Sequence, residues 1–199
     1  MTTASKITVT RILLVPVFAV FAIYYGVSVE EGEPKEWLRV WALATFILAS
    51  ASDGLDGWVA RRFKQQSRLG ATLDPIADKS LLLTAIITLS FVEWGPGGWQ
   101  IPRWFTALVI FRDCLILGGV AVLHFMNHQV VIQPHWTGKV CTFTQMFALG
   151  WVMLRVIPMD PIYPCLVAAL FTLWSGYAYF HEGLLQLRDS PWIKPGSHP

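Results

Sequence analysis

Residues 53–78 read DGLDGWVARRFKQQSRLGATLDPIAD. Four aspartates stand in it, Asp53, Asp56, Asp74 and Asp78, and apolar sequence flanks them on both sides. Carboxylates set that deep in hydrophobic sequence are costly, and in membrane segments they usually carry function. The stretch therefore predicts a polar site inside an otherwise apolar protein.

Helical spacing places these acids on two faces, because residues three or four apart lie on the same side of a helix. The first stripe consists of Asp53, Asp56, Gly57 and Ala60, and the second of Gly70, Asp74 and Asp78. A short basic loop joins the two segments, so we expect them to be antiparallel neighbours. At about 1.5 Å of rise per residue, the four acids then converge at similar depth.

Four facing carboxylates cannot all ionise in a low-dielectric setting without compensation. Arg61 alone supplies too little positive charge. Two divalent cations would balance four carboxylates, and hard oxygen ligands suit Mg²⁺ first and Mn²⁺ next. The sequence therefore predicts a two-metal site, which also suits displacement of a leaving group at phosphorus.

Small residues surround the acids. Gly57 and Ala60 lack bulk and would let a nucleotide approach the helix closely. Arg61 offers a planar fork for a phosphate. Pro75 frees a backbone carbonyl one turn earlier and is expected to bend its helix near the acids.

The composition is that of an integral membrane protein, with 54% hydrophobic and 14% charged residues. Six apolar stretches are each long enough to cross a hydrocarbon core of about 30 Å. They run about Ile7–Val27, Trp37–Ala60, Leu69–Val92, Ile101–Asn127, Trp136–Ile157 and Pro161–Leu187. We expect an all-α fold with six transmembrane helices in one bundle, forming a single domain over residues 1–199 with 190–199 as a loose tail.

Basic residues set the expected orientation. With both termini inside, eleven Lys and Arg fall inside and four outside. The loop at residues 30–36 is acidic and would lie outside, whereas the loop at 61–68 is the most basic and would lie inside. The polar site should therefore face the cytoplasm of a bacterial-type inner membrane, or the matrix side of a mitochondrial inner membrane.

The order D-x2-D-G-x2-A-R-x8-G-x3-D-x3-D resembles the signature of CDP-alcohol phosphotransferases. These enzymes make phospholipids by displacing CMP from a CDP-linked lipid or alcohol. The resemblance implies a six-helix membrane bundle, usually a homodimer, that uses CDP-diacylglycerol.

The resemblance also implies a role for each motif residue. Asp53, Asp56 and Asp74 match the metal ligands, and Asp78 matches the aspartate that touches the metals and acts as general base on the acceptor hydroxyl. The residues expected to bind the CDP-lipid are Gly57, Ala60, Arg61, Ser67 and Gly70.

The sequence motifs identify the acceptor substrate less clearly than the reaction. Residues 8–11 resemble the N-terminal segment of both phosphatidylglycerophosphate synthases and eukaryotic-type cardiolipin synthases. The triplet 111–113, Phe-Arg-Asp, leans toward cardiolipin synthase, whereas 137–139, Thr-Gly-Lys, resembles the glycerophosphate enzymes. We expect phosphatidylglycerol as the acceptor, with cardiolipin as the product, and keep glycerol 3-phosphate as the alternative.

Four cationic residues are candidates for binding either acceptor: Arg11, Lys79, Arg112 and Lys139. Plainer roles stand beside these. Arg112 could simply pair with Asp113 or Asp78, and Lys139 could be an anchor at the inner membrane surface.

Two other interpretations remain open for the motif. The acids could pair with neighbouring basic residues as a solvated helix end. They could also serve an ion or proton transporter, although such proteins place ligands on broken helices in repeated halves, and no second copy of the motif is visible. The basic loop is too short, and lacks the interleaved aromatics, for a nucleic-acid partner; the surface of the lipid bilayer suffices.

Overall fold

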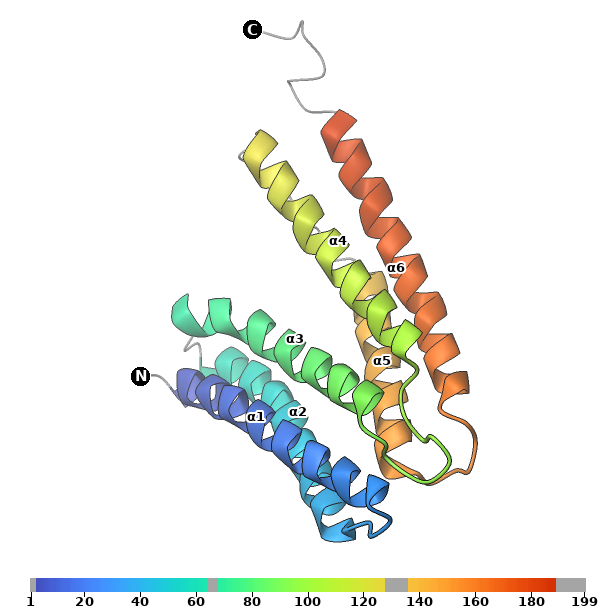
Figure 1. Cartoon of the computed structure of the whole chain (residues 1–199). Coiled ribbons are helices and arrows are strands. Elements are labelled where there is room, and N and C mark those ends of the chain that lie inside the picture. The colour runs from blue at the N-terminus through green and yellow to red at the C-terminus, as the bar shows by residue number, and fades with distance from the viewer. Residues whose placement is uncertain (1–2, 64–67, 128–135, 189–199) are drawn as a thin grey trace, which may run out of the picture. The chain divides into compact units, whose positions relative to one another are not determined.

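A computed structural model of the chain describes residues 3–63, 68–127 and 136–188, with side chains within 10–52, 79–119, 121–122 and 136–185. Six helices make up the described fold (Figure 1). They are α1 (Thr3–Glu30), α2 (Glu36–Phe63), α3 (Arg68–Phe91), α4 (Arg103–Asn127), α5 (Trp136–Leu154) and α6 (Ile162–Arg188). The expected all-α fold with six helices is confirmed. The tail at 190–199 lies outside the described residues.

The helix ends follow local chemistry. Pro102 precedes α4, and its carbonyl accepts a 2.9 Å bond from the Phe105 amide in the first turn. The end of α5 was predicted near Ile157 but falls at Leu154. The next residue, Arg155, has a φ of 51°. That left-handed conformation ends a right-handed helix.

The chain forms two compact units. The first contains residues 1–101 and 149–161, and so holds α1, α2, α3 and the last turn and a half of α5. The second contains residues 102–148 and 162–199, and so holds α4, most of α5 and α6.

In the first unit, α1 packs on both α2 and α3, and α2 also contacts α3. Phe18 of α1 meets Phe46 of α2 with ring centroids 5.6 Å apart. Ala22 and Ala42 are fully buried. Small side chains let helix backbones approach closely, which is how apolar helices gain packing energy in a lipid environment.

A hydrogen-bonded cluster closes the loop end of this unit. The Arg155 Nη1 donates to the Tyr25 hydroxyl at 3.2 Å and to the Trp94 carbonyl at 3.3 Å. The indole N–H of Trp94 donates to the Met153 carbonyl at 3.1 Å. A Cβ on Gly95 would lie 2.8 Å from Arg155 Cζ. Glycine at position 95 is therefore what lets the guanidinium reach these partners.

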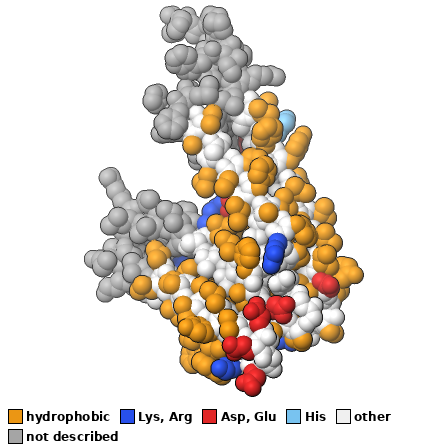
Figure 2. All heavy atoms as spheres, viewed as in Figure 1, with side chains coloured by type: hydrophobic (Ala, Val, Ile, Leu, Met, Phe, Trp, Pro, Cys, Tyr) orange, Lys and Arg blue, Asp and Glu red, His pale blue; other side chains and the backbone are white. Residues whose placement is uncertain are grey.

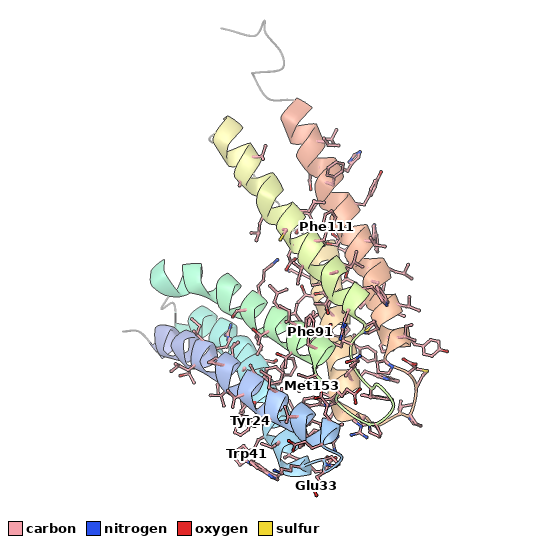
Figure 3. All side chains as sticks on the ribbon, in the orientation of Figure 1. Tyr24, Glu33, Trp41, Phe91, Phe111 and Met153 are labelled. Atoms are coloured by element: carbon pink, nitrogen blue, oxygen red, sulfur yellow. The ribbon has the colours of Figure 1, made fainter. Side chains whose placement is uncertain are left out.

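Acidic side chains gather at the same end of the α1–α2 pair, around the loop between them (Figure 2). They include Glu31, Glu33 and Glu36, and Glu33 is labelled in Figure 3. Glu36 accepts a 2.6 Å bond from the Nε of Arg39. This acidic end is the one that sequence reasoning assigned to the outside.

In the second unit, α4 packs on α6, and α5 contributes side chains to the interior. Gln145 of α5 donates to the Thr172 hydroxyl of α6 at 3.0 Å, and that hydroxyl donates to the Ala168 carbonyl at 2.7 Å. Both side chains are buried. Each polar group thus finds a partner within the helices, as burial requires.

Large apolar side chains cover much of the helix surface. Tyr24, Trp41 and Phe111, which are labelled in Figure 3, are all more than half exposed. Within the described residues, two helices are long and apolar enough by length and composition to cross a membrane, over Thr10–Glu30 and Ile162–Leu185. Exposed apolar surface of this extent suits a lipid environment.

Candidate active site

The motif aspartates lie on two consecutive helices of the first unit. Asp53 and Asp56 stand in the last three turns of α2, and Asp74 and Asp78 in the first three turns of α3. Their backbone is helical, whereas their side chains lie outside what the structure describes. The helical spacing on which the two stripes depend is therefore present.

Contacts of α1 fix the direction of α2. Phe18 meets Phe46, and the Tyr25 hydroxyl lies 3.4 Å from Glu36 Oε1, so residues further along α1 meet residues earlier in α2. The two helices are antiparallel. The end of α2 consequently lies beside the start of α1.

A contact between α1 and the end of α3 likewise gives the direction of α3. Gly26 near the end of α1 lies directly against the Val92 side chain at the end of α3, and a Cβ on Gly26 would collide with it. The helices α1 and α3 therefore run in the same direction, as Figure 1 also shows. The start of α3 lies at the same end of the unit as the end of α2, so the backbone brings both parts of the motif to one end.

Most of the residues expected to bind the CDP-lipid lie on the same two helices as the motif aspartates. Gly57, Ala60 and Arg61 lie on the last turns of α2, and Gly70 on the first turn of α3, with side chains that are not described. Ser67 lies in residues 64–67, outside the described residues.

Among the acceptor candidates, Arg112 of α4 lies within the second unit. Its Nη1 donates to Asp113 Oδ1 at 2.8 Å, and its Nη2 donates to the Ser175 hydroxyl of α6 at 2.5 Å. The guanidinium also lies over the Tyr179 ring, 5.5 Å from its centroid. Pairing with Asp113, the plainer role for Arg112, is thus present in the structure.

Two glycines make room for this arginine. A Cβ on Gly138 of α5 would lie 3.1 Å from the Tyr179 hydroxyl and 3.8 Å from Arg112 Nη2, and one on Gly176 would lie 3.5 Å from Arg112 Cγ. The buried Nε of Arg112 has no hydrogen-bond partner among the described residues. The guanidinium therefore keeps one donor available in a buried setting.

The Thr137-Gly138-Lys139 segment borders this cluster. The buried Thr137 hydroxyl also has no hydrogen-bond partner in the described part of the chain. Lys139 is exposed. Arg112, Thr137 and Lys139 together offer the types of donor that a phosphate group accepts.

Arg11 and Lys79 belong to the other unit. Arg11 of α1 is fully buried, Lys79 of α3 is partly buried, and both interact with other residues. The Arg11 side chain therefore does not face water.

Sequence reasoning missed Ser175 and Tyr179 as partners of Arg112. The two residues are four apart on α6 and so share a face. That spacing, with Gly176 between them, is the signal that could have indicated a polar contact on this helix.

The chemistry of the motif suits a hard divalent cation, since four carboxylates supply oxygen ligands and the compensating charge is small. Elsewhere, the described side chains include no group of three or more His, Cys, Asp or Glu that could hold a metal. The four motif carboxylates stay the predicted metal ligands.

In the described residues the protein is all-helical and has exposed apolar surfaces, and four aspartates lie on the helices at one end of its first unit. The chain belongs to the CDP-alcohol phosphatidyltransferase family, whose model matches residues 1–178. It is accordingly an enzyme of an integral membrane family that typically uses divalent metal ions. Family membership argues against the transporter and the solvated helix end.

Relatives resemble the chain over most of its length. A "Probable phosphatidylglycerophosphate synthase" of Mycobacterium tuberculosis is 35% identical over 188 residues, which cover 91% of this chain and 81% of the relative. A "CDP-diacylglycerol--glycerol-3-phosphate 3-phosphatidyltransferase" of Blochmanniella floridana is 33% identical over 184 residues, 88% of this chain and 87% of the relative. The Escherichia coli K12 protein of the same name is 31% identical over 191 residues, 92% of this chain and 95% of the relative.

Proposed function

We propose that the chain is a phosphatidylglycerophosphate synthase, which transfers the phosphatidyl group of CDP-diacylglycerol to glycerol 3-phosphate and releases CMP. The observation that carries this is the similarity, over about nine-tenths of the chain, to proteins named for that reaction. These relatives favour the alternative from the sequence, glycerol 3-phosphate, over the cardiolipin reaction toward which residues 111–113 leaned.

The cluster around Arg112 supports an acceptor that carries a phosphate. Its buried guanidinium retains a free Nε donor, and the Thr137 hydroxyl beside Gly138 is also available among the described residues. Lys139 adds an exposed cation next to this segment. A dianionic phosphate needs several donors of this kind.

In the reaction, the acceptor hydroxyl oxygen attacks the phosphorus that bears diacylglycerol. A new P–O bond forms, the P–O bond to CMP breaks, and CMP leaves with the bonding electron pair. Asp78 takes the proton from the acceptor hydroxyl. Two Mg²⁺ or Mn²⁺ ions, when bound by Asp53, Asp56, Asp74 and Asp78, would offset the negative charge of the diphosphate.

The remaining motif residues bind and orient the nucleotide lipid. Arg61 forms a planar fork toward the diphosphate, because guanidinium geometry matches two phosphate oxygens. Gly57 and Ala60 leave room for the cytidine, and Ser67 and Gly70 border the same substrate. The lipid chains of CDP-diacylglycerol stay in the bilayer.

The same proposal covers the setting of the enzyme. All six helices span an inner membrane as one domain, and both termini and the motif face the cytoplasm, since the basic loop at 61–68 lies at the motif end. The active form is a homodimer.

Cardiolipin synthesis is the second candidate. The ion pair between Arg112 and Asp113 favours it, because an aspartate beside the arginine reduces the positive charge open to a dianion. Phosphatidylglycerol carries a single negative charge and is less affected by this reduction.

A competition assay separates the two acceptors. With labelled CDP-diacylglycerol and both acceptors present at concentrations matched to their KM values, phosphatidylglycerophosphate should be the dominant product. The products are separated by chromatography. If cardiolipin dominates and glycerol 3-phosphate does not react, the proposed acceptor is wrong and the second candidate, cardiolipin synthesis, is favoured.

Replacing Arg112 by Lys should raise the KM for glycerol 3-phosphate by about tenfold, because an ammonium cannot hold Asp113 and Ser175 in a fork and also face a phosphate. The KM for CDP-diacylglycerol should stay within about twofold, because the motif lies on other helices. Steady-state kinetics with each substrate varied in turn make the comparison. An equal rise in both KM values would contradict the assignment of Arg112 to the acceptor.

A further inference from the structure

Arg11 is a buried charged residue to which the proposed reaction assigns no role. It lies on α1, its side chain is fully buried, and it interacts with another residue. A buried guanidinium is stable only when a negative group compensates it, because the desolvation cost of a lone ion is several kcal/mol or more. The question is which acid lies near it.

The contact between Phe18 and Phe46 shows which part of α2 lies level with Arg11. Arg11 is seven residues before Phe18, and Asp53 is seven residues after Phe46. Seven residues make nearly two full turns, so each residue returns to the face of its phenylalanine after about 10 Å of rise. Because α1 and α2 are antiparallel, both steps lead toward the same end. Arg11 is thus level with position 53 of the α2 backbone.

The contact between Gly26 and Val92 gives a second, independent register. Arg11 is fifteen residues before Gly26, and Asp78 is fourteen residues before Val92. Because α1 and α3 run in the same direction, both steps again lead to the same end, over lengths that differ by about 1.5 Å. Arg11 is level with Asp78 as well as with Asp53.

The other acids of the first unit are too far along the helices to serve. They are Glu30, Glu31, Glu33, Glu36, Glu93 and Asp160, which all fall at or beside the loops that follow α1, α3 and α5. Tyr25, which contacts Glu36, is fourteen residues from Arg11, or about 21 Å along the helix. Of the ten acids in the sequence of this unit, the motif aspartates are nearest to Arg11 along the helices, and positions 53 and 78 are level with it.

We infer that Arg11 is a fixed cation of the aspartate cluster, a positioning residue that offsets part of the carboxylate charge when no metal is bound. The inference deepens the proposed function and rests on its metal-binding motif. Arg11 then holds the start of α1 against the ends of α2 and α3 in the metal-free enzyme. It also weakens metal binding, because a nearby positive charge repels a divalent cation.

The test compares two matched variants of the purified full-length protein, Arg11→Met and Arg155→Met. Both remove an arginine of the first unit and keep a long apolar side chain, but Arg155 lies at the opposite end, against Tyr25 and Trp94. The probe is Mn²⁺, whose free concentration is followed by electron paramagnetic resonance. The second measurement is the midpoint of thermal unfolding in chelator and in saturating Mn²⁺.

The Arg11→Met protein should bind Mn²⁺ about tenfold more tightly than the unchanged protein, since the repulsion is gone. It should lose more thermal stability in chelator than in saturating Mn²⁺. Arg155→Met should lose stability equally in both conditions and keep its Mn²⁺ affinity. Arg11→Lys, which retains the charge, should bind Mn²⁺ like the unchanged protein.

Unchanged or weaker Mn²⁺ binding by Arg11→Met would overturn the inference. If that variant does not fold alone, the double variant Asp53→Asn with Arg11→Met should fold, because charge is again balanced; failure of the double variant to fold also overturns it. If the unchanged protein binds no Mn²⁺ at all, the fault lies instead with the proposed metal-dependent function.

Discussion

Replacing Asp56 by Asn should lower turnover by about 10²-fold or more, the usual scale for loss of one electrostatic element of catalysis. The variant keeps the shape of the side chain but removes one of four carboxylate charges at the motif end of α2. Release of CMP from CDP-diacylglycerol is the measurement. The matched control is Asp160→Asn, an exposed acid beyond α5, which should retain normal turnover.

The same experiment includes removal of metal. Excess chelator should abolish CMP release by the unchanged enzyme, and Mg²⁺ or Mn²⁺ should restore it, because the carboxylates cannot hold the diphosphate without cations. For Asp56→Asn, the metal concentration that gives half-maximal rate should also rise. Full activity in excess chelator would rule out the two-metal site.

Asp78→Asn should lose turnover by a comparable factor while CDP-diacylglycerol still binds. Three acids remain to hold metal, but the group that accepts the hydroxyl proton is gone. Arg61→Ala should show the opposite pattern, with weaker binding of CDP-diacylglycerol because a phosphate partner has been removed. Equilibrium binding of the nucleotide lipid, measured beside single-turnover rates, separates the two effects.

Near-normal turnover by Asp78→Asn would mean that another residue takes the proton. A parallel loss of lipid binding in both variants would mean that Asp78 acts only as a ligand. Arg62→Ala is the matched control for Arg61→Ala, since it removes the neighbouring charge from the same turn without removing the motif arginine.

The helices were predictable from the sequence because length and apolarity determine them. All six were expected within a few residues of their observed bounds. One difference, the early end of α5, lies directly before the positive φ of Arg155. The side chain of Arg155 bonds to Tyr25 and Trp94, which are 130 and 61 residues away in the chain, and no local pattern predicts these partners.

The part of the candidate site that lies within a short stretch of sequence was predictable. The two aspartate pairs follow helical spacing, and their helices are neighbours in sequence. The partners of Arg112 were not predictable in this way, because Ser175 is 63 residues away on another helix. Arg11 was expected to be an acceptor contact because it is cationic, and its complete burial, on which the role proposed above rests, was not predictable from its place in the sequence.

The acceptor shows the limit of short motifs. Residues 111–113 and 137–139 gave opposing indications, and three residues carry too little information to decide between two reactions that share every other step. The relatives use nearly the whole chain, and their names agree with the Thr-Gly-Lys segment.

The cluster at Arg155 has a consequence for how the polypeptide is made. Trp94 and Trp99 precede α4, yet their indole N–H groups donate to the carbonyls of Met153 and Val152 in the last turn of α5. During synthesis these acceptors emerge more than fifty residues later than the tryptophans. The bonds that Trp94 and Trp99 make can therefore form only after α5 has been synthesised, and a ribosome that stalls after α4 leaves a fragment that contains four complete helices but lacks these bonds.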